Sequence, residues 1–222
     1  KRNGWPAGFP DDGAFPGPQG PYYCGVGTGR VAYRDLVEEH TTACMEAGIK
    51  ISGTNAEVMP GQWEFQIGPA GTVEVGDHLW IARYLLDVLS EKYDVIASIA
   101  AKPMKGDWNG AGMHTNFSTK AMREGPYSLI EDACEAMGAI GKPEEHLEGY
   151  GIGIEDRLTG AHETQRYDQF SYGVSDRGAS IRIPWQVAQD GKGYIEDRRP
   201  NANADPYVVS TLLTNTICSA LA

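Results

Sequence analysis

The sequence predicts an α+β fold, in which a largely antiparallel sheet is accompanied by separate helices. Three observations carry this prediction. Apolar residues recur at helical spacing in some segments, polar and apolar residues alternate as in half-buried strands in others, and the two kinds of segment follow one another in mixed order. A doubly wound sheet would need strict alternation of strand and helix, so the order favours the α+β class.

Helical spacing is clearest in two segments of the first half of the chain. Val31, Leu36 and Cys44 recur near this spacing within residues 30–48, and a second such segment covers residues 77–93. Both read as amphipathic helices. Further helices are expected at about residues 127–140 and from residue 207 onward.

A hairpin is expected between the first two helices. Residues 50–58 and 62–69 alternate like strands around the sequence MPGQ, with Trp63, Phe65 and Ile67 on the face opposite to the polar residues between them. Further strands are expected at residues 95–101, 113–119, 179–185 and 192–197.

Length and composition indicate one large domain. The 222 residues contain 41% hydrophobic side chains, which suffices for a sizeable core, and no internal repeat or linker marks a boundary after residue 30. Residues 1–29 are rich in glycine and proline, so we expect them to form a loop that leads into a single domain over residues 1–222.

The charge of the chain limits its partners. A formal net charge of −11 repels phosphate backbones and anionic lipid, so neither nucleic acid nor a membrane is an expected partner. The four cysteines are far apart and form no CxxC pair, which favours a reducing, cytoplasmic setting. An acidic chain still binds a nucleotide when divalent cations bridge its carboxylates to the phosphates.

The hairpin places two carboxylates together. If Pro60 and Gly61 form its tip, Glu57 lies directly opposite Glu64 on one face. Like charges in that position destabilise a sheet unless water separates them or a cation neutralises both, and a hard cation such as Mg²⁺ or Mn²⁺ fits. The same residues also fit a solvated polar face of an edge hairpin.

Two further residues are candidate metal ligands. His114 follows the segment GDWNGAGM, whose glycines allow backbone to approach a ligand closely, and Glu196 lies in KGYIEDRRP. Each has a structural alternative, because a lone histidine is often part of the packing and an acid before two arginines often forms a local salt bridge.

Four arginines lie in segments that read as loops or strand edges rather than helix faces. Arginine suits bidentate recognition of carboxylate and phosphate, and a transferring phosphoryl group needs positive charge around it. The alternative is a set of surface arginines that offset nearby acids. They are Arg157, Arg177, Arg182 and Arg198.

Residues 148–164, EGYGIGIEDRLTGAHET, contain several glycines and few apolar anchors, as expected of a loop that opens and closes over a site.

Three familiar motifs are excluded. HETQR has Arg166 where a zinc-protease HExxH needs its second histidine, GVGTGR is no dinucleotide loop, and no G-x-x-x-x-G-K-[ST] loop occurs.

Several segments together resemble one enzyme family. GTNAEVMPGQWEFQIGP, GDWNGAGMHTNFSTKAMR, RLTGAHET, GVSDRGASIRIP and GYIEDRRPNANADPY, with FPGPQGPYYCGVG near the start, are closely similar to the type II glutamine synthetases. The resemblance implies a curved, half-barrel-like catalytic domain. It also implies ATP-dependent ligation of ammonia to L-glutamate through γ-glutamyl phosphate, giving glutamine, ADP and phosphate.

The resemblance assigns roles by motif. Two or three Mg²⁺ or Mn²⁺ ions are implied per site, one held by Glu57 and Glu64 and another by His114 and Glu196. The implied catalytic residues are Glu163, which closes the glutamate entrance and takes a proton, and Arg177, which stabilises the transferring phosphoryl group. Glutamate would be held by Trp108, Asn109, Gly110, Arg157, Arg177 and Arg198. ATP would contact Glu64, Gln66, Asn116, Ser118, Arg177, Arg182 and Tyr194.

The resemblance also implies what lies beyond these residues. The family has an E-x-E metal pair before this region and a small N-terminal domain, and neither is in this sequence, so each cation pair is expected to need a further ligand. A homo-oligomer, generally a decamer of two stacked rings, is implied. Two alternatives stay open: a related γ-glutamyl-amine ligase, and a structural relative without activity.

Overall fold

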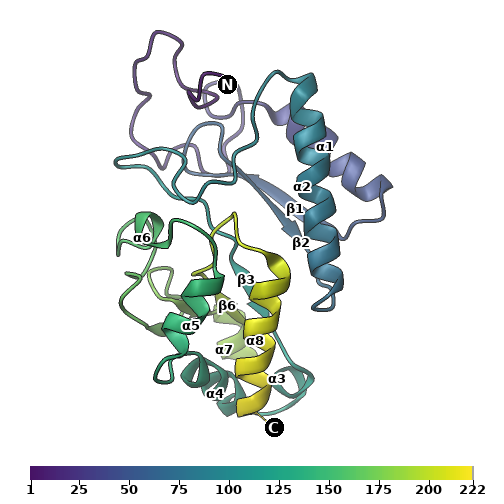
Figure 1. Ribbon diagram of the computed structural model, residues 1–222, viewed down its shortest axis with the longest axis vertical. Coiled ribbons are helices and arrows are strands. Elements are labelled where there is room, and N and C mark those ends of the chain that lie inside the picture. The colour runs from purple at the N-terminus through teal and green to yellow at the C-terminus, as the bar shows by residue number, and fades with distance from the viewer. Residues whose placement is uncertain (222) are drawn as a thin grey trace. The chain divides into compact units, whose positions relative to one another are not determined.

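The computed structural model of the chain describes residues 1–221, which fold as two compact units (Figure 1). Unit 1 consists of Lys1–Ser98 and Met104–Asn109, and unit 2 of Ile99–Pro103 and the chain from Gly110 onward. The fold class is α+β, as the sequence predicts. The single domain expected from composition stays a prediction.

Unit 1 is a hairpin with two helices. Its elements are α1 (Arg34–Glu46), β1 (Ile51–Ala56), β2 (Trp63–Ile67) and α2 (Glu74–Lys92), and the two strands pair antiparallel. Cys44, Ile49 and Ala82 form the core between helices and sheet. A second apolar cluster of Phe9, Met59 and Trp108 anchors the residues before α1, which contain turns but no helix or strand.

Unit 2 surrounds a four-stranded sheet with short helices. The strands are β3 (Thr115–Phe117), β4 (Tyr172–Val174), β5 (Ile181–Ile183) and β6 (Ile195–Asp197), in the order β3-β6-β5-β4. Only the β4–β5 pair is parallel within the described sheet. The helices are α3 (Lys120–Glu124), α4 (Ser128–Met137), α5 (Lys142–Gly149), α6 (Ile154–Arg157), α7 (Trp185–Asp190) and α8 (Pro206–Ala220).

Helix α8 shows how the sequence builds this core. Asp205 caps its first turn by accepting a hydrogen bond from the backbone N–H of Tyr207, and proline occupies the first helical position, where no N–H is needed. Val209, Leu213 and Ile217 recur every four residues and are buried against α4 and the sheet. These side chains share one buried cluster with Ile195 of β6 and complete the core of unit 2.

The predicted helices at residues 30–48, 77–93, 127–140 and from 207 are present with shorter or shifted ends. The strand predicted at residues 95–101 is wrong: this stretch forms no ladder among the described residues, because alternation alone does not supply a neighbouring strand. Helices α3, α5, α6 and α7 and strand β4 were not anticipated. The two sheets do not confirm a half-barrel.

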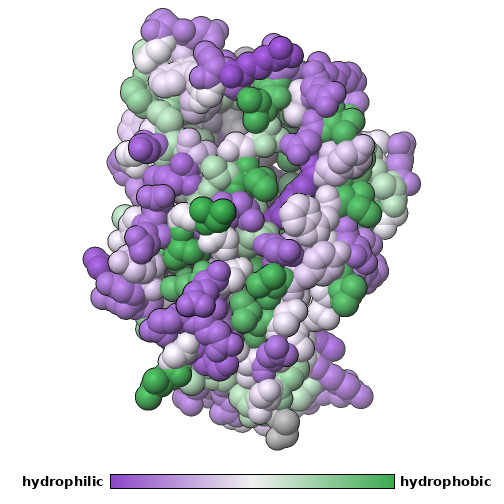
Figure 2. All heavy atoms as spheres, viewed as in Figure 1, coloured by the Kyte–Doolittle hydropathy of each residue, from purple (hydrophilic) through white to green (hydrophobic). Residues whose placement is uncertain are grey.

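The surface agrees with the composition. On the face drawn in Figure 2, polar side chains cover most of the surface and apolar ones are scattered among them. All four cysteines are free thiols. Within residues 1–221, no helix combines the length and apolarity needed to span a bilayer.

Candidate functional site

The acidic hairpin face has a different register from the predicted one. Glu64 pairs with Asn55, not with Glu57, so the prediction of directly opposite carboxylates is wrong. The cause is the turn, in which the N–H of Gln62 donates to the carbonyl of Met59. The N–H of Glu57 donates to the carbonyl of Gln62, so Glu57 lies opposite Gln62. Gly61 at the tip has a φ of 75°, the left-handed conformation that a Pro-Gly type II turn requires.

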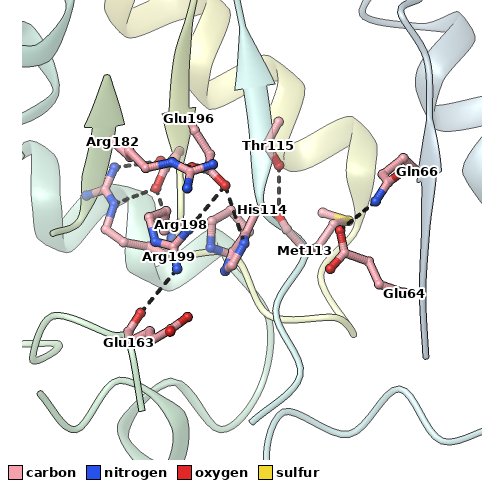
Figure 3. Close-up of polar contacts among 12 residues, drawn as sticks. Glu64, Gln66, Met113, His114, Thr115, Glu163, Arg182, Glu196, Arg198 and Arg199 are labelled. Atoms are coloured by element: carbon pink, nitrogen blue, oxygen red, sulfur yellow. Dashed lines mark hydrogen bonds and ion pairs between the residues drawn. The ribbon is translucent and has the colours of Figure 1, made fainter. Parts of the chain in front are cut away.

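The register differs by two residues, so every side chain keeps its face. Glu57 and Glu64 are therefore diagonal neighbours, and amide groups link this face. Gln66 Nε2 donates to Glu64 Oε1 at 2.9 Å (Figure 3). It also donates to Asn55 Oδ1 at 3.1 Å. The pKa of Glu57 is raised to about 7 by burial, by a hydrogen bond shared with Glu64 and by the negative charge of Glu64. At pH 7 Glu57 is thus protonated in about half of the molecules, and a cation could replace this proton.

Strand β6 provides the second group of charged residues. Successive side chains of a strand point to opposite faces, and here Glu196 and Arg198 lie on one face while Asp197 and Arg199 lie on the other. The sequence EDRR therefore forms two separate acid–arginine pairs, each between residues two positions apart. Alternation along this strand was the signal by which they could have been told apart.

Glu196, the acid of the pair with Arg198, is in contact with three other charged or titratable side chains (Figure 3). Its carboxylate is 5% exposed, with Oε1 3.2 Å from Arg198 Nη1 and 3.5 Å from His114 Nδ1. Its other oxygen, Oε2, is in ion-pair contact with Arg182 Nε but accepts no hydrogen bond of proper geometry from the described residues. The structure thus brings together four residues that the sequence singled out separately, His114, Arg182, Glu196 and Arg198.

His114 is held as a neutral ring. Desolvation, followed by the charges of Arg198 and Arg157, lowers its pKa well below the ordinary value, although 35% of its side chain remains accessible. A neutral imidazole is the form that can ligate a metal.

Arg157 does not lie in an open loop, contrary to the expectation, but ends the one-turn helix α6 and is 5% exposed. Its Nη1 donates to the carbonyls of Arg199 and Pro200, and its Nη2 donates to the carbonyl of Arg198 at 2.9 Å. Burial, with a contribution from the charge of Arg198, lowers its pKa to about 10, so it remains charged at neutral pH. This guanidinium is thus held mainly by backbone carbonyls, with side-chain contacts to Asn201 Oδ1 at 3.3 Å and to His114 Nε2 at 3.2 Å.

Two glycines make room for that guanidinium. A Cβ at Gly112 would lie 2.2 Å from Arg157 Nη2, and one at Gly110 would lie 2.6 Å from Arg157 Cγ. The glycines in DWNGAGM were expected to let backbone approach a ligand. In this structure they let Arg157 approach the backbone.

The expected flap carries Glu163. His162 and Glu163 both have positive φ values, 54° and 58°, which is strained for residues with side chains. Glu163 Oε1 lies 3.4 Å from Arg177 Nη1, and its carbonyl accepts from Arg198 Nη2 at 3.3 Å. The two residues with expected catalytic roles are therefore neighbours within unit 2.

The expected nucleotide contacts fall in both units. In unit 2, Asn116 of β3 pairs with Glu196, and the hydroxyl of Ser118 donates to the carbonyl of Gly193 at 2.6 Å, next to Tyr194. Arg182 belongs to the Glu196 cluster described above. In unit 1, Gln66 and Glu64 belong to the acidic face. Of the expected glutamate contacts, Trp108 is buried beside Phe9 in the same unit, and Asn109 follows it.

A buried network on the core face of β6 was not anticipated. Arg199 donates to both oxygens of Asp197, at 2.9 and 2.8 Å, and Tyr150 donates to Asp197 Oδ2 at 2.6 Å. Since Tyr150 has only one proton, it must accept from His146 Nδ1, and His146 Nε2 then accepts from Thr216. Burial raises the pKa of Asp197, but Arg199 outweighs it and the net shift is downward.

A small cavity lies beside this network. It is lined by Leu147, Leu158, Thr164, Arg198 and Arg199, among others, and its volume is only about 10 Å³. That is room for about one water molecule. The cavity is too small for an amino acid or a nucleotide.

The two candidate cation pairs fit a metal unequally. Glu57 and Glu64 offer hard oxygen donors whose mutual repulsion a cation relieves. Glu196 already faces Arg182 and Arg198, so His114 and Glu196 have less need of a cation. No group of three or more potential protein ligands comes together within residues 1–221, so further ligands are needed at either pair.

An α+β chain with a cation-attracting carboxylate face in one unit and clustered arginines in the other has the chemistry of proteins that bind divalent cations and anionic ligands. Comparison with known families makes this specific. A family profile described as glutamine synthetase, catalytic domain, matches residues 22–137, just over half of the chain. The chain belongs to this family.

Individual relatives match along the whole chain. It is 63% identical over 220 residues to a glutamine synthetase of Streptomyces viridochromogenes, covering 99% of this chain and 64% of that protein. It is 58% identical over 220 residues to a glutamine synthetase of Emericella nidulans, covering 99% of this chain and 61% of that protein. The chain thus spans a little under two thirds of these relatives.

Proposed function

We propose that the protein to which this chain belongs ligates ammonia to L-glutamate at the expense of ATP, through γ-glutamyl phosphate, giving glutamine, ADP and phosphate. The observation that carries the proposal is the 63% identity, over 99% of the chain, to a relative named glutamine synthetase. The site geometry supports it, because acid pairs and arginines are what a phosphoryl transfer to a carboxylate requires.

The proposed cation sites differ in strength. Glu57 and Glu64 would hold one Mg²⁺ or Mn²⁺ ion, and His114 and Glu196 a second, with two or three ions in the complete site. A bound cation supplies charge neutralisation for the phosphates and the acyl phosphate. Binding at Glu196 requires Arg182 or Arg198 to turn away from it, and the phosphates of ATP are the anions that would receive them.

The remaining roles concern the two substrates. Arg177 stabilises the transferring phosphoryl group, and Glu163 closes the glutamate entrance and takes a proton from the adduct of ammonia. The strained backbone at Glu163 supports a segment that changes conformation. Trp108, Asn109, Gly110, Arg177 and Arg198 hold glutamate, and ATP contacts Glu64, Gln66, Asn116, Ser118, Arg177, Arg182 and Tyr194.

Arg157 is assigned a supporting role in glutamate binding. Its guanidinium donates to the carbonyls of Arg198, Arg199 and Pro200. It therefore acts on the substrate by holding the backbone from which Arg198 projects. This differs from the direct contact that the family resemblance implies.

The proposal extends to assembly and setting. We propose a homo-oligomer, a decamer of two stacked rings, in the cytoplasm, with no nucleic acid or membrane partner. The net charge of −11 supports the absence of a nucleic acid or membrane partner, and the free cysteines support the cytoplasmic setting.

The test is an assay of phosphate release by the full-length protein with ATP, Mg²⁺, glutamate and ammonium. We expect activity that requires all four, is lost in Glu57→Gln, and is retained in Glu46→Gln, an exposed glutamate on α1 of the same unit. A preference for another amine over ammonium would favour the γ-glutamyl-amine ligase instead. No glutamate-dependent activity in the wild type would favour the inactive structural relative.

A further inference from the structure

Gln19, in the glycine- and proline-rich segment before α1, forms a reciprocal pair of hydrogen bonds with Asn109. Gln19 Oε1 accepts from the backbone N–H of Asn109 at 2.6 Å, and Gln19 Nε2 donates to Asn109 Oδ1 at 2.7 Å. The two residues are 90 positions apart in sequence but belong to the same unit. No role for Gln19 follows from the motifs considered above.

The orientation of both amides is determined by one backbone group. The N–H of Asn109 is only a donor, so the atom of Gln19 that faces it must be the oxygen. The nitrogen of Gln19 then faces the side chain of Asn109, and because it is only a donor, the atom it meets must be Asn109 Oδ1. Neither amide can be reversed without placing two donors or two acceptors together.

This orientation leaves the amide nitrogen of Asn109 as the group directed away from Gln19. Within residues 1–221, this nitrogen donates to no protein acceptor. Asn109 therefore presents two N–H donors to a ligand. Donors suit the oxygen of a carboxylate, whereas a reversed amide would present an oxygen and repel it.

The support for Gln19 is also fixed in place. The backbone N–H of Gly20 donates to the carbonyl of Val58 at 3.2 Å, which ties this segment to the end of the acidic hairpin. On the other side of the pair, Trp108 is 7% exposed and packs against Phe9 with ring centroids 5.0 Å apart. Both partners thus extend from anchored backbone, and the pair holds one geometry.

We propose that Gln19 is a positioning residue that selects for a carboxylate ligand by fixing Asn109 as a hydrogen-bond donor. The proposal rests on the proposed function, in which Asn109 contacts the amino-acid substrate. Gln19 itself does not touch the substrate.

Two substitutions of similar size separate this role from simple support of the fold. Gln19→Glu keeps the acceptor for the backbone N–H but places its second oxygen against Asn109 Oδ1, so the amide of Asn109 must reverse and present its oxygen to the ligand. Gln19→Met removes both hydrogen bonds and leaves Asn109 free to choose its orientation. The charged variant should therefore be the worse one for a carboxylate substrate.

Steady-state kinetics of the full-length protein, with glutamate and ATP varied in turn, provide the test. We expect the KM for glutamate to rise about tenfold in Gln19→Glu and about threefold in Gln19→Met. The KM for ATP and the melting temperature should be nearly unchanged in both. A role confined to the fold would change both KM values together and would rank the methionine variant, which loses both bonds, as the more damaging.

The outcomes distinguish the inference from the function on which it rests. If the wild type is active and the two variants have equal KM values for glutamate, or the methionine variant has the higher one, the inference is overturned and the proposed function stands. If the wild type has no glutamate-dependent activity, the proposed function is overturned, and with it the role of Gln19 toward that substrate.

Discussion

The acidic hairpin of unit 1 and strand β6 of unit 2 use carboxylates in opposite ways. Glu57 and Glu64 are surrounded by amides, and no arginine or lysine forms an ion pair with either among the described residues. Glu196 and Asp197 each lie against an arginine two positions further along the same segment. The cation proposed for the hairpin would therefore have to come from outside the chain, whereas β6 carries its own positive charge.

The difference is visible in proton affinity. Glu57 holds a proton far more tightly than an ordinary glutamate, while Asp197 stays ionised although it is fully buried. Burial raises the pKa of both, so the neighbouring charges decide the direction: Glu64 adds to the rise at Glu57, and Arg199 reverses it at Asp197. The proposed metal pair thus differs from a structural ion pair in that the described residues supply no counter-charge to it.

The largest expected effect on stability is at β6, where the protein supplies its own counter-charge. Asp197→Asn leaves Arg199 buried without its partner charge, and we expect the free energy of unfolding, measured with urea, to fall by about 3–5 kcal/mol. Asp168→Asn is the matched control, since Arg166 and Asp168 have the same bidentate geometry on the surface. Equal losses in the two variants would contradict the assigned importance of burial.

The hairpin should respond to pH in the absence of metal. The pKa of Glu57 is raised in the folded state from an ordinary 4.5 to about 7, so stability is greatest below pH 4.5 and is lost as the pH rises through 7. This contribution is at most about 3 kcal/mol. Urea unfolding in a chelator from pH 4.5 to 8 should show it in the wild type and not in Glu57→Gln. A pH dependence that is identical in the variant would contradict it.

His146 beneath β6 should respond with the opposite sign. Burial, with the charge of Arg199, lowers its pKa from 6.5 to about 4, so its contribution is present above pH 6.5 and is lost as the pH falls toward 4. The size is about 3 kcal/mol or less. Comparing His146→Gln with the wild type over pH 4–7 isolates it. If the variant lost stability on acidification as steeply as the wild type, the assignment would be wrong.

A smaller effect is expected where the arginines meet the backbone. Gly112→Ala would place a methyl group on Arg157 and displace it from the carbonyls of Arg198 and Arg199, and we expect a loss of about 1–3 kcal/mol by urea unfolding. Gly71→Ala is the control, because a Cβ there meets no atom within 4 Å and its backbone is not left-handed. A stable Gly112→Ala protein would show that Arg157 has room to move.

The sequence predicted which face of a strand a side chain occupies better than it predicted which strand lies beside it. The period of two along a strand placed Glu57 and Glu64 on one face, and this survived a register error of two residues because such an error preserves the face. The same period fails at residues 95–101, where a suitable pattern has no strand beside it. Local patterns describe one segment, whereas pairing depends on a second.

Long-range pairs explain what remained unseen in the candidate site. Gln19 and Asn109 are 90 residues apart, and His146 and Thr216 are 70 apart, so no spacing rule connects them. The segment EDRR did contain a usable signal, since alternation separates Glu196 and Arg198 from Asp197 and Arg199. The motifs located the charged residues, and only the fold determined which charge meets which.

The most direct test of the account is Mn²⁺ binding to the full-length protein, measured by titration calorimetry near pH 6.5 in two buffers of different ionisation enthalpy. Because the folded pKa of Glu57 is about 7, binding should release a large part of one proton per ion held by the hairpin. We predict that Glu57→Gln abolishes this release and weakens the binding by about tenfold or more, whereas Glu46→Gln changes neither. Wild-type affinity and proton release in Glu57→Gln would contradict the claim that the hairpin depends on an external cation.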